Sequence, residues 1–292
     1  MVTERSSKRV AQSTVTVYAE AIIPFMQYVN RSPERTILSR DSLSYLLGMY
    51  GASARDCQLR PLHAAARFFF PEVPRDRLTA ELKGLEKSTK RTPTTPFTLP
   101  LLVAFAVFTS QRVGLGAAVG VIVAFFGLLR TAEVIKIRPI DVILRTSYIA
   151  ITTIRLTSTK SGREQVVQFE PNSVAERALK HLLLSRDFRQ YQGLFGFRTY
   201  RDLYQLVMEF KCHFQLTLPL TPHSLRAGGA TYLRLCGFSM TVIADIGRWE
   251  AVITARGYVD IVFTLLPETK SAEARVYPTA TSSLRVFVVG PW

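Results

Sequence analysis

The sequence predicts a mainly α-helical protein with one small β-hairpin, arranged as a helical N-terminal domain followed by a larger α+β domain. Three observations predict this fold class. Apolar residues recur at helical spacing over most of the chain, a basic proline-rich stretch interrupts them near residue 90, and two short β-branched segments flank a polar turn. Apolar residues make up 48% of the 292 residues, which is enough to build a core and argues against disorder.

The first domain is expected to occupy residues 1–87 and to contain four helices. The first follows a Ser/Thr start signal, and the second starts at Asp41. These helices are predicted over Ser13–Val29, Asp41–Gly51, Gln58–Phe70 and Leu78–Leu85.

Residues 88–99 are predicted to link this domain to a second one over residues 100–292. The surrounding stretch KSTKRTPTTPFTLP holds three prolines and five threonines, so it does not favour a regular element. Its cations Lys87, Lys90 and Arg91 are candidates for contact with a phosphate backbone.

The second domain is predicted to be helical around one hairpin. Its strands are expected over Tyr148–Arg155 and Gln165–Phe169, with Ser161-Gly162 at the turn. The apolar run Val113–Leu129 is short for a membrane span and rich in glycine, so a buried core helix is favoured over a transmembrane segment.

The C-terminal tail is expected to be irregular. A short helix over Glu268–Arg275 is bracketed by Pro267 and Pro278, which limit its length. The apolar end from Leu284 to Trp292 is expected to be a strand or a loose tail.

The charge of the chain predicts a polyanionic partner. The formal net charge is +15 and the isoelectric point is about 10.1. Residues 1–95 carry 15 Lys/Arg against 9 Asp/Glu, and the rest of the chain is also basic, so two basic halves can neutralise a duplex from two sides. An anionic membrane stays open as an alternative partner. The three cysteines, Cys57, Cys212 and Cys236, have no metal-ligand spacing and fit a reducing compartment.

The second domain also carries residue types that suit cleavage of a phosphodiester. Such cleavage needs a nucleophile, cations around the non-bridging oxygens and a proton donor for the departing oxygen. Arginine suits the cationic role because its planar guanidinium binds phosphate oxygens in pairs and stays charged. Each residue alone also has an ordinary structural interpretation, such as a helix cap, an exposed lysine or a core aromatic. The set, in chain order, is Arg130, Glu133, Lys160, His223, Arg226, Trp249 and Tyr258.

The order and spacing of these residues resemble the tyrosine recombinase (phage integrase) family. The family pattern is Arg…Lys…His-x-x-Arg…His/Trp…Tyr, and the match covers roughly Pro96–Asp260. The tryptophan at position 249, nine residues before Tyr258, resembles the pattern of Cre-like members of the family. The segment HSLRAGGATYLRLCG, with GRW after it, resembles recombinases of the eukaryotic DIRS and Crypton mobile elements.

The resemblance implies a DNA recombinase that works through a 3′-phosphotyrosine, with no metal or cofactor. It implies an N-terminal core-binding domain, a catalytic domain over residues 100–292, double-stranded DNA as partner and a tetramer on DNA. The implied roles are nucleophile for Tyr258, phosphate clamp for Arg130 and Arg226, general acid for Lys160, acid/base for His223, hydrogen-bond donor for Trp249 and orienting group for Glu133.

Other arginines and three glycines have predicted secondary roles. Arg138, Arg163 and Arg248 are candidate DNA contacts; Arg163 also competes with Lys160, and a surface role is favoured for Arg248 and for Arg256. Gly228, Gly229 and Gly237 are expected to permit close packing and turning. The protein is expected inside the cell and associated with DNA, in the nucleus of a eukaryote or the cytoplasm of a bacterium. A catalytically inactive DNA-binding derivative, a type IB topoisomerase-like relaxing enzyme and a membrane-associated basic protein stay open as alternatives.

Overall fold

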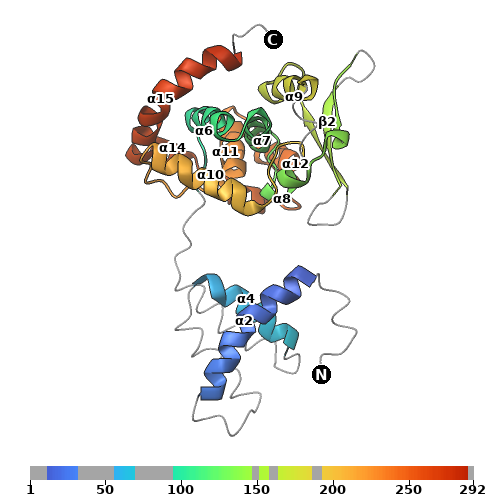
Figure 1. Ribbon diagram of the computed structural model, residues 1–292, viewed down its shortest axis with the longest axis vertical. Helices are drawn as coiled ribbons and strands as arrows, with labels where there is room; N and C mark the ends of the chain where they lie inside the picture. The colour runs from blue at the N-terminus through green and yellow to red at the C-terminus, as the bar shows by residue number, and fades with distance from the viewer. Residues whose placement is uncertain are drawn as a thin grey trace. The chain divides into compact units, whose positions relative to one another are not determined.

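The computed structural model divides the chain into two compact units, Met1–Thr92 and Pro93–Trp292 (Figure 1). The structure describes residues 12–31, 56–69, 95–146, 151–157, 164–185 and 193–288. The predicted helices Asp41–Gly51 and Leu78–Leu85 lie outside these ranges.

The first unit contains two described helices that pack against each other. They are α2, Gln12–Arg31, and α4, Asp56–Phe69, and they confirm the helices predicted over Ser13–Val29 and Gln58–Phe70. Their apolar faces bury a small cluster, which consists of Ile22, Phe25, Leu62, Ala65 and Ala66.

The second unit is built around two buried helices, α6 (Leu99–Arg112) and α7 (Leu115–Phe126). The other long helices pack on this pair, since α9 and α11 contact α7, while α10, α11 and α15 contact α6. Their bounds are Val174–Leu184 for α9, Tyr200–His213 for α10, Ser224–Leu235 for α11 and Pro267–Val288 for α15. Figure 1 shows α6 and α7 side by side near the middle of the unit.

Helix α7 accounts for the long apolar run. Gly114, with φ +127°, is the N-cap residue of α7, and nine consecutive residues from Ala117 to Phe125 are buried. The core-helix prediction is therefore confirmed. Among the helices of the described ranges, none is both long enough and apolar enough to cross a bilayer.

A three-stranded antiparallel sheet covers one end of this unit, in the order β1-β2-β3. The strands are β1, Val142–Ile143, β2, Thr152–Leu156, and β3, Gln165–Phe169. Ile154 pairs with Val167, and every second residue of β2 and β3 faces the core. The two antiparallel strands of the predicted hairpin are confirmed, with the first described strand residue at Thr152, whereas the predicted turn at Ser161-Gly162 lies outside the described residues. Strand β1 was not predicted, because two residues carry no period of alternation.

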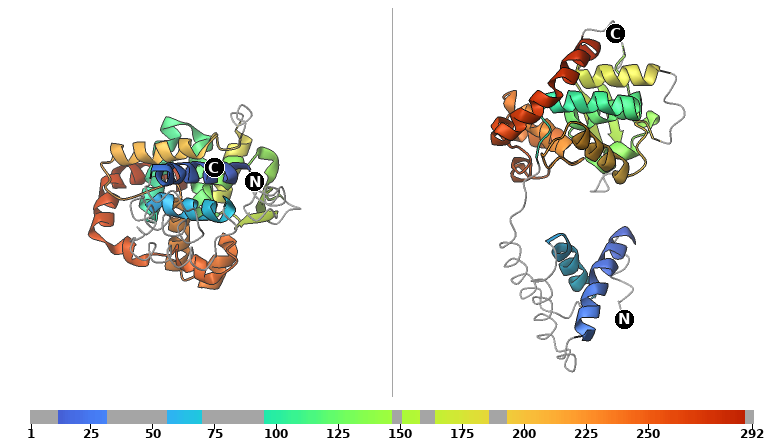
Figure 2. Two further views of the ribbon diagram at one scale, coloured as in Figure 1. Left: turned by 90° about the horizontal axis from the view of Figure 1, so that it is seen from below. Right: turned by 60° about the vertical axis from the view of Figure 1, so that its left-hand side comes forward.

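Helix α15 corrects the prediction for the C-terminal tail. It runs for 22 residues through Pro278 and includes Leu284–Val288, where the sequence predicts a strand or a loose tail. Ala272 and Val276 are buried in the main core, where α15 packs on α6. This packing outweighs the local cost of one internal proline. Figures 1 and 2 place α15 and the sheet at opposite sides of the unit.

Short elements connect the long helices and the sheet of the second unit. Helix α8 and the 3₁₀ turn η2 follow α7, while α12, α13 and α14 follow α11. Their bounds are Thr131–Lys136, Pro139–Asp141, Met240–Gly247, Val252–Arg256 and Ile261–Leu265.

Candidate active site

Arg130 and Glu133 form the first part of the site, at the start of α8. Arg130 is the N-cap residue, and its backbone N–H donates to Glu133 Oε2 at 2.9 Å, as in a capping box. Its guanidinium Nη1 donates to Glu133 Oε1 at 2.7 Å. The Arg130 side chain is 32% exposed, whereas that of Glu133 is 2% exposed. The buried carboxylate thus orients an arginine that remains accessible.

Arg226, on α11, forms the second part and is 1% exposed. Its Nη1 donates to the carbonyl of Leu128, and its Nη2 donates to the carbonyl of Gly247. Its Nε has no hydrogen-bond partner among the described residues. Buried arginines are usually paired with a carboxylate. Arg226 is instead held by two backbone carbonyls, which leave its positive charge uncompensated by direct contact.

Two glycines allow α11 to bring Arg226 to this depth. A Cβ atom on Gly228 would lie 2.2 Å from the Phe97 carbonyl oxygen, and one on Gly229 would lie 2.0 Å from the Phe125 carbonyl oxygen. Both obstacles are backbone atoms, which cannot move aside easily. The prediction that Gly228 and Gly229 permit close packing is confirmed, as is a turn at Gly237, where φ is +90°.

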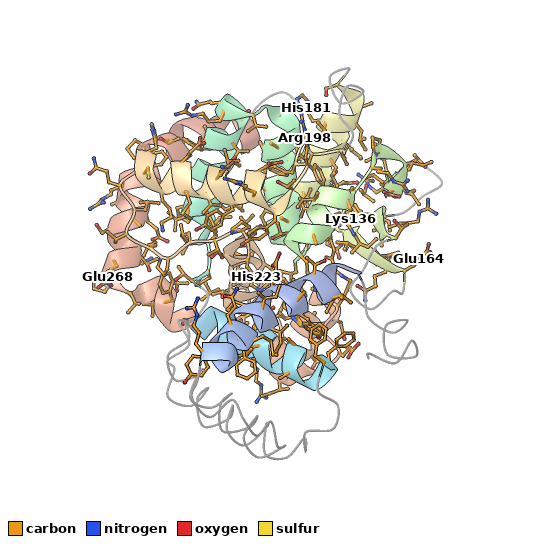
Figure 3. The ribbon with its side chains drawn as sticks, turned by 60° about the horizontal axis from the view of Figure 1, so that its bottom comes forward. Lys136, Glu164, His181, Arg198, His223 and Glu268 are labelled. Atoms are coloured by element: carbon orange, nitrogen blue, oxygen red, sulfur yellow. The ribbon has the colours of Figure 1, made fainter. Side chains whose placement is uncertain are left out.

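Tyr258 and His223 form the third part. The Tyr258 hydroxyl lies 3.0 Å from His223 Nε2, and the two rings are T-shaped with centroids 5.1 Å apart. His223 is the N-cap residue of α11 and appears near the centre of the view in Figure 3. Three residues after it, Arg226 lies with its Cζ 5.8 Å from the Tyr258 ring centroid. One turn of α11 therefore presents both a base and a guanidinium to the same phenol.

Trp249 covers Arg226. The guanidinium Cζ lies 4.2 Å from the Trp249 ring centroid, a cation–π contact, and the Trp249 ring also packs on Tyr258 at 4.9 Å. Gly247 makes room for the indole, because a Cβ there would lie 1.9 Å from Trp249 Cζ3. Trp249 and Tyr258 belong to a small apolar cluster around buried Leu128, Ala230 and Ile243.

Thr231 fastens the backbone of the tyrosine to α11. Its hydroxyl donates to the Tyr258 carbonyl at 3.4 Å and accepts the backbone N–H of Asp260 at 3.1 Å. The Tyr258 N–H also donates to the Ala255 carbonyl at 3.0 Å, which closes the turn after α13. The position of the phenol is therefore set by α11 and α13 together.

The electrostatics of the site favour an anion. Burial, together with the charges of Arg130 and Arg248, lowers the pKa of Arg226 to about 9, so it stays charged at neutral pH. Burial and the charges of Arg226 and Arg130 lower the pKa of His223, which favours the neutral imidazole. Burial alone would raise the pKa of Glu133, but Arg248 and Arg130 lower it overall and keep the carboxylate charged. Two guanidinium groups thus bind the Glu133 carboxylate, and the charge of Arg226 lies near enough to interact with it.

The structure brings together six of the seven residues predicted for cleavage, and it leaves Lys160 and the predicted DNA contacts other than Arg248 elsewhere or outside its described ranges. Arg138 is 57% exposed and pairs with Asp141 through its Nε at 3.2 Å. Arg256 is exposed on α13. Those that meet are Arg130, Glu133, His223, Arg226, Trp249 and Tyr258. Those outside the described residues are Lys87, Lys90, Arg91, Lys160 and Arg163.

Arg248 corrects the expectation of a surface role. Its side chain is 8% exposed, and its Nη2 donates to Glu133 Oε2 at 2.8 Å. It also donates to the carbonyls of Gly127, Leu128 and Ile246. Burial follows from the left-handed backbone at Arg248, with φ +57°, which ends α12 and turns the side chain toward α8.

Three groups of the site were missed by sequence reasoning. The carbonyls of Leu128 and Gly247 hold Arg226, and the hydroxyl of Thr231 holds the backbone around Tyr258. Backbone acceptors leave no signal in residue type. Gly247, directly before a basic and an aromatic residue, was the one signal available, because a glycine beside bulky residues indicates close approach.

No protein-family model matches the sequence, and no curated protein matches it. Similar solved structures include the XerH site-specific recombinase bound to palindromic difH substrate, with 18% identity, a TM-score of 0.64 and coverage of 91% of this chain and 80% of the other.

Two other similar structures are a lambda integrase and a transposon integrase. The lambda integrase tetramer bound to a Holliday junction shows 12% identity and a TM-score of 0.65, covering 88% of this chain and 76% of the other. The Tn1549 transposon integrase in complex with transposon right end DNA shows 13% identity and a TM-score of 0.62, covering 94% and 96%. The chain therefore has the mostly helical fold, with a small three-stranded sheet, of tyrosine recombinase catalytic domains.

Proposed function

We propose that this chain cleaves and rejoins DNA strands as a site-specific tyrosine recombinase, through a covalent 3′-phosphotyrosine at Tyr258. The observation that carries the proposal is the meeting of Tyr258, His223 and Arg226, where the phenol lies within hydrogen-bond distance of a base and near a buried guanidinium. The shared fold and the net charge of +15 support it.

In the first step, the phenol of Tyr258 attacks the scissile phosphorus. An ordinary tyrosine has a pKa of about 10, so its proton must pass to a base as the bond forms. His223 is suited to this because its pKa is lowered and its Nε2 lies 3.0 Å from the hydroxyl. With the imidazole protonated on Nδ1, Nε2 accepts that proton.

Arginines stabilise the extra negative charge on the phosphate. Arg130, accessible and oriented by Glu133, and Arg226, near the phenol, bind the two non-bridging oxygens in this proposal. Arg226 must become accessible to do so, since it is 1% exposed under Trp249. The indole N–H of Trp249 is then a further donor to the phosphate.

The bond from phosphorus to the 5′ oxygen breaks, and that oxygen takes up a proton. We assign this proton to Lys160, with Arg163 as the competing donor; both follow β2 in the chain. The phosphotyrosine retains the energy of the broken bond, so attack by a 5′ hydroxyl reverses the steps and rejoins a strand.

The same proposal covers the organisation and partners of the protein. Residues 1–87 serve as a core-binding domain, residues 88–99 as a linker and residues 100–292 as the catalytic domain. Lys87, Lys90, Arg91 and Arg138 contact the backbone of double-stranded DNA. Self-association as a tetramer on DNA is proposed because a lambda integrase of this fold is a tetramer on a Holliday junction.

We also propose that the chain comes from a mobile element. The GRW sequence with the HSLRAGGAT segment supports a Cre-like catalytic domain of the DIRS or Crypton type. The protein then acts inside the cell on DNA, in the nucleus if the host is a eukaryote and in the cytoplasm if it is a bacterium.

A suicide duplex with a nick near the cleavage position tests the function. The wild-type chain is expected to form a covalent protein–DNA adduct, because the small fragment released at the nick cannot be rejoined. Tyr258→Phe is expected to bind the duplex and form no adduct. Tyr204→Phe, which changes an exposed tyrosine on α10, is the matched control and should react like the wild type. An adduct with Tyr258→Phe would move the nucleophile elsewhere.

A catalytically inactive DNA-binding protein is the second candidate. One observation favours it: both terminal nitrogens of Arg226 already donate to backbone carbonyls. On this alternative Arg226 is structural, and the wild-type chain binds the suicide duplex without forming an adduct at any time or pH. The same experiment therefore separates the two candidates.

A further inference from the structure

Arg248 joins the two arginines of the candidate active site. Its Nη2 donates to Glu133 Oε2 at 2.8 Å and to the Leu128 carbonyl at 3.2 Å. Glu133 also binds Arg130, and the Leu128 carbonyl also accepts from Arg226. One shared acceptor thus separates Arg248 from each of the two arginines.

The backbone at Arg248 indicates that its side chain is needed there. Arg248 ends α12 with φ +57° and ψ +42°, in the left-handed region that glycine or asparagine usually occupies at this position. An arginine tolerates this conformation at a cost in backbone energy. Its Nη1 also donates to the carbonyls of Gly127 at 3.2 Å and Ile246 at 3.3 Å, so it ties the turn after α7 to the end of α12.

Burial separates Arg248 from Arg130 and Arg138. Arg226 is also buried, but it lies beside Tyr258, with its Cζ 5.8 Å from the ring centroid. The Arg248 side chain is 8% exposed, compared with 32% for Arg130 and 57% for Arg138. Its two terminal nitrogens already serve four acceptors. A phosphate could reach Arg248 only by displacing this network.

We propose that Arg248 is a positioning residue, which fixes the separation of Arg130 and Arg226 through Glu133 and the Leu128 carbonyl and touches no DNA. The inference rests on the proposed cleavage reaction. Two guanidinium groups bind one phosphate in the transition state only when their separation matches its oxygens. The loss of Arg248 should therefore slow the chemical step and leave DNA binding unchanged.

The test uses the full chain, the nicked suicide duplex and single-turnover kinetics. Arg248→Gly removes the side chain and also relieves the left-handed backbone, so it adds no strain. We expect its maximal rate constant for adduct formation to fall about 100-fold, since misplacement near 1 Å has an effect of that order. The duplex concentration for half-maximal rate and the salt dependence of binding should not change. Arg248→Lys, which keeps the charge but has one donor nitrogen, should recover part of the rate. Arg234→Gln, at an exposed arginine of α11, should match the wild type.

Three results would contradict this role for Arg248. An unchanged rate constant in Arg248→Gly means that Arg248 positions nothing. Weaker binding, with a salt slope smaller by about one unit, means that it contacts a phosphate. If less of the Arg248→Gly protein forms adduct but the rate constant is unchanged, Arg248 affects only the fraction of the protein that is folded. A wild-type chain that forms no adduct contradicts the proposed function instead, and the role of Arg248 then falls with it.

Discussion

The hydroxyl of Tyr258 and the Nε2 atom of His223 lie 3.0 Å apart, although 35 residues separate them in the sequence. The contact depends on α11, whose N-cap residue is His223, and on the turn after α13, which ends at Tyr258. It pairs a phenol with an imidazole whose pKa is lowered by burial and by Arg226 and Arg130.

Replacing His223 by glutamine tests this pair. Glutamine still offers a hydrogen bond to Tyr258 but cannot take up its proton, so we expect adduct formation to slow by about 10²-fold with DNA affinity unchanged. Because the pKa of His223 is lowered, the neutral base persists below the usual histidine value of about 6.5. The acidic limb of the wild-type rate profile should therefore lie below pH 6.5, and rapid-quench assays across pH measure it. An acidic limb above pH 6.5 would rule out this assignment of the base.

The fluorescence emission of Trp249 should change when Arg226 becomes accessible to a phosphate. Arg226 is 1% exposed under the indole, so a phosphate can reach it only if Trp249 moves. The chain has two tryptophans, and Trp292→Phe leaves Trp249 as the single reporter. We expect a shift of its emission when the duplex is added to this variant, and the same shift with Tyr258→Phe also present. If the emission stays constant while the duplex binds, Arg226 remains covered and serves a structural role.

Gly228 and Gly237 form a matched pair for stability. A Cβ on Gly228 would meet the Phe97 carbonyl oxygen at 2.2 Å, so Gly228→Ala should lower the free energy of unfolding by about 3 kcal/mol. At Gly237 a Cβ meets nothing within 4 Å, so Gly237→Ala should cost only the left-handed backbone penalty of about 1 kcal/mol. Urea titration followed by circular dichroism measures both values. Equal losses would mean that α11 can shift away from Phe97.

Glu176 should make the stability of the second unit sensitive to acid. It is buried, and its carboxylate accepts from Arg145 Nε at 2.9 Å and Thr152 Oγ1 at 3.0 Å. Burial opposes ionisation, but these donors, with Asn172 and Lys180, lower the pKa of Glu176 from 4.5 to about 2.

The stabilisation from Glu176 is present above the unfolded value of 4.5 and is lost as the pH falls toward 2. We expect Glu176→Gln to be less stable than the wild type at pH 7, by an amount on the order of 2 kcal/mol. The difference should shrink between pH 5 and pH 2. Glu170→Gln, at an exposed residue before α9, is the control. A difference that does not vary with pH would exclude this titration as the cause.

The elements that sequence reasoning located are those with a local signal. The run Val113–Leu129 and the strand Gln165–Phe169 were found because composition and β-branching act over a few neighbouring residues. Helix α15 was underestimated because Pro278 is a local signal to stop, whereas Val276 gains its stability from burial against distant parts of the chain. The two-residue strand β1 exists only through its pairing with β2.

The candidate site was predictable in its side chains and not in its backbone. The three-residue spacing of His223 and Arg226 predicted that they share a helix face, and both lie at Tyr258. The burial of Arg248 was not predictable, because it depends on a left-handed turn and on acceptors more than 100 residues away. A polar arginine beside a tryptophan is more often exposed, so residue type alone favoured the wrong role.

Because the hydroxyl of Thr231 binds the Tyr258 backbone, α11 sets the positions of three groups of the site. His223 is its N-cap residue, and Arg226 lies on its first turn. Thr231, on its third turn, donates a hydrogen bond to the Tyr258 carbonyl. A small rotation of α11 would therefore change the positions of all three groups together. Pairs of substitutions along it should therefore combine less than additively, as expected for parts of a single mechanical unit.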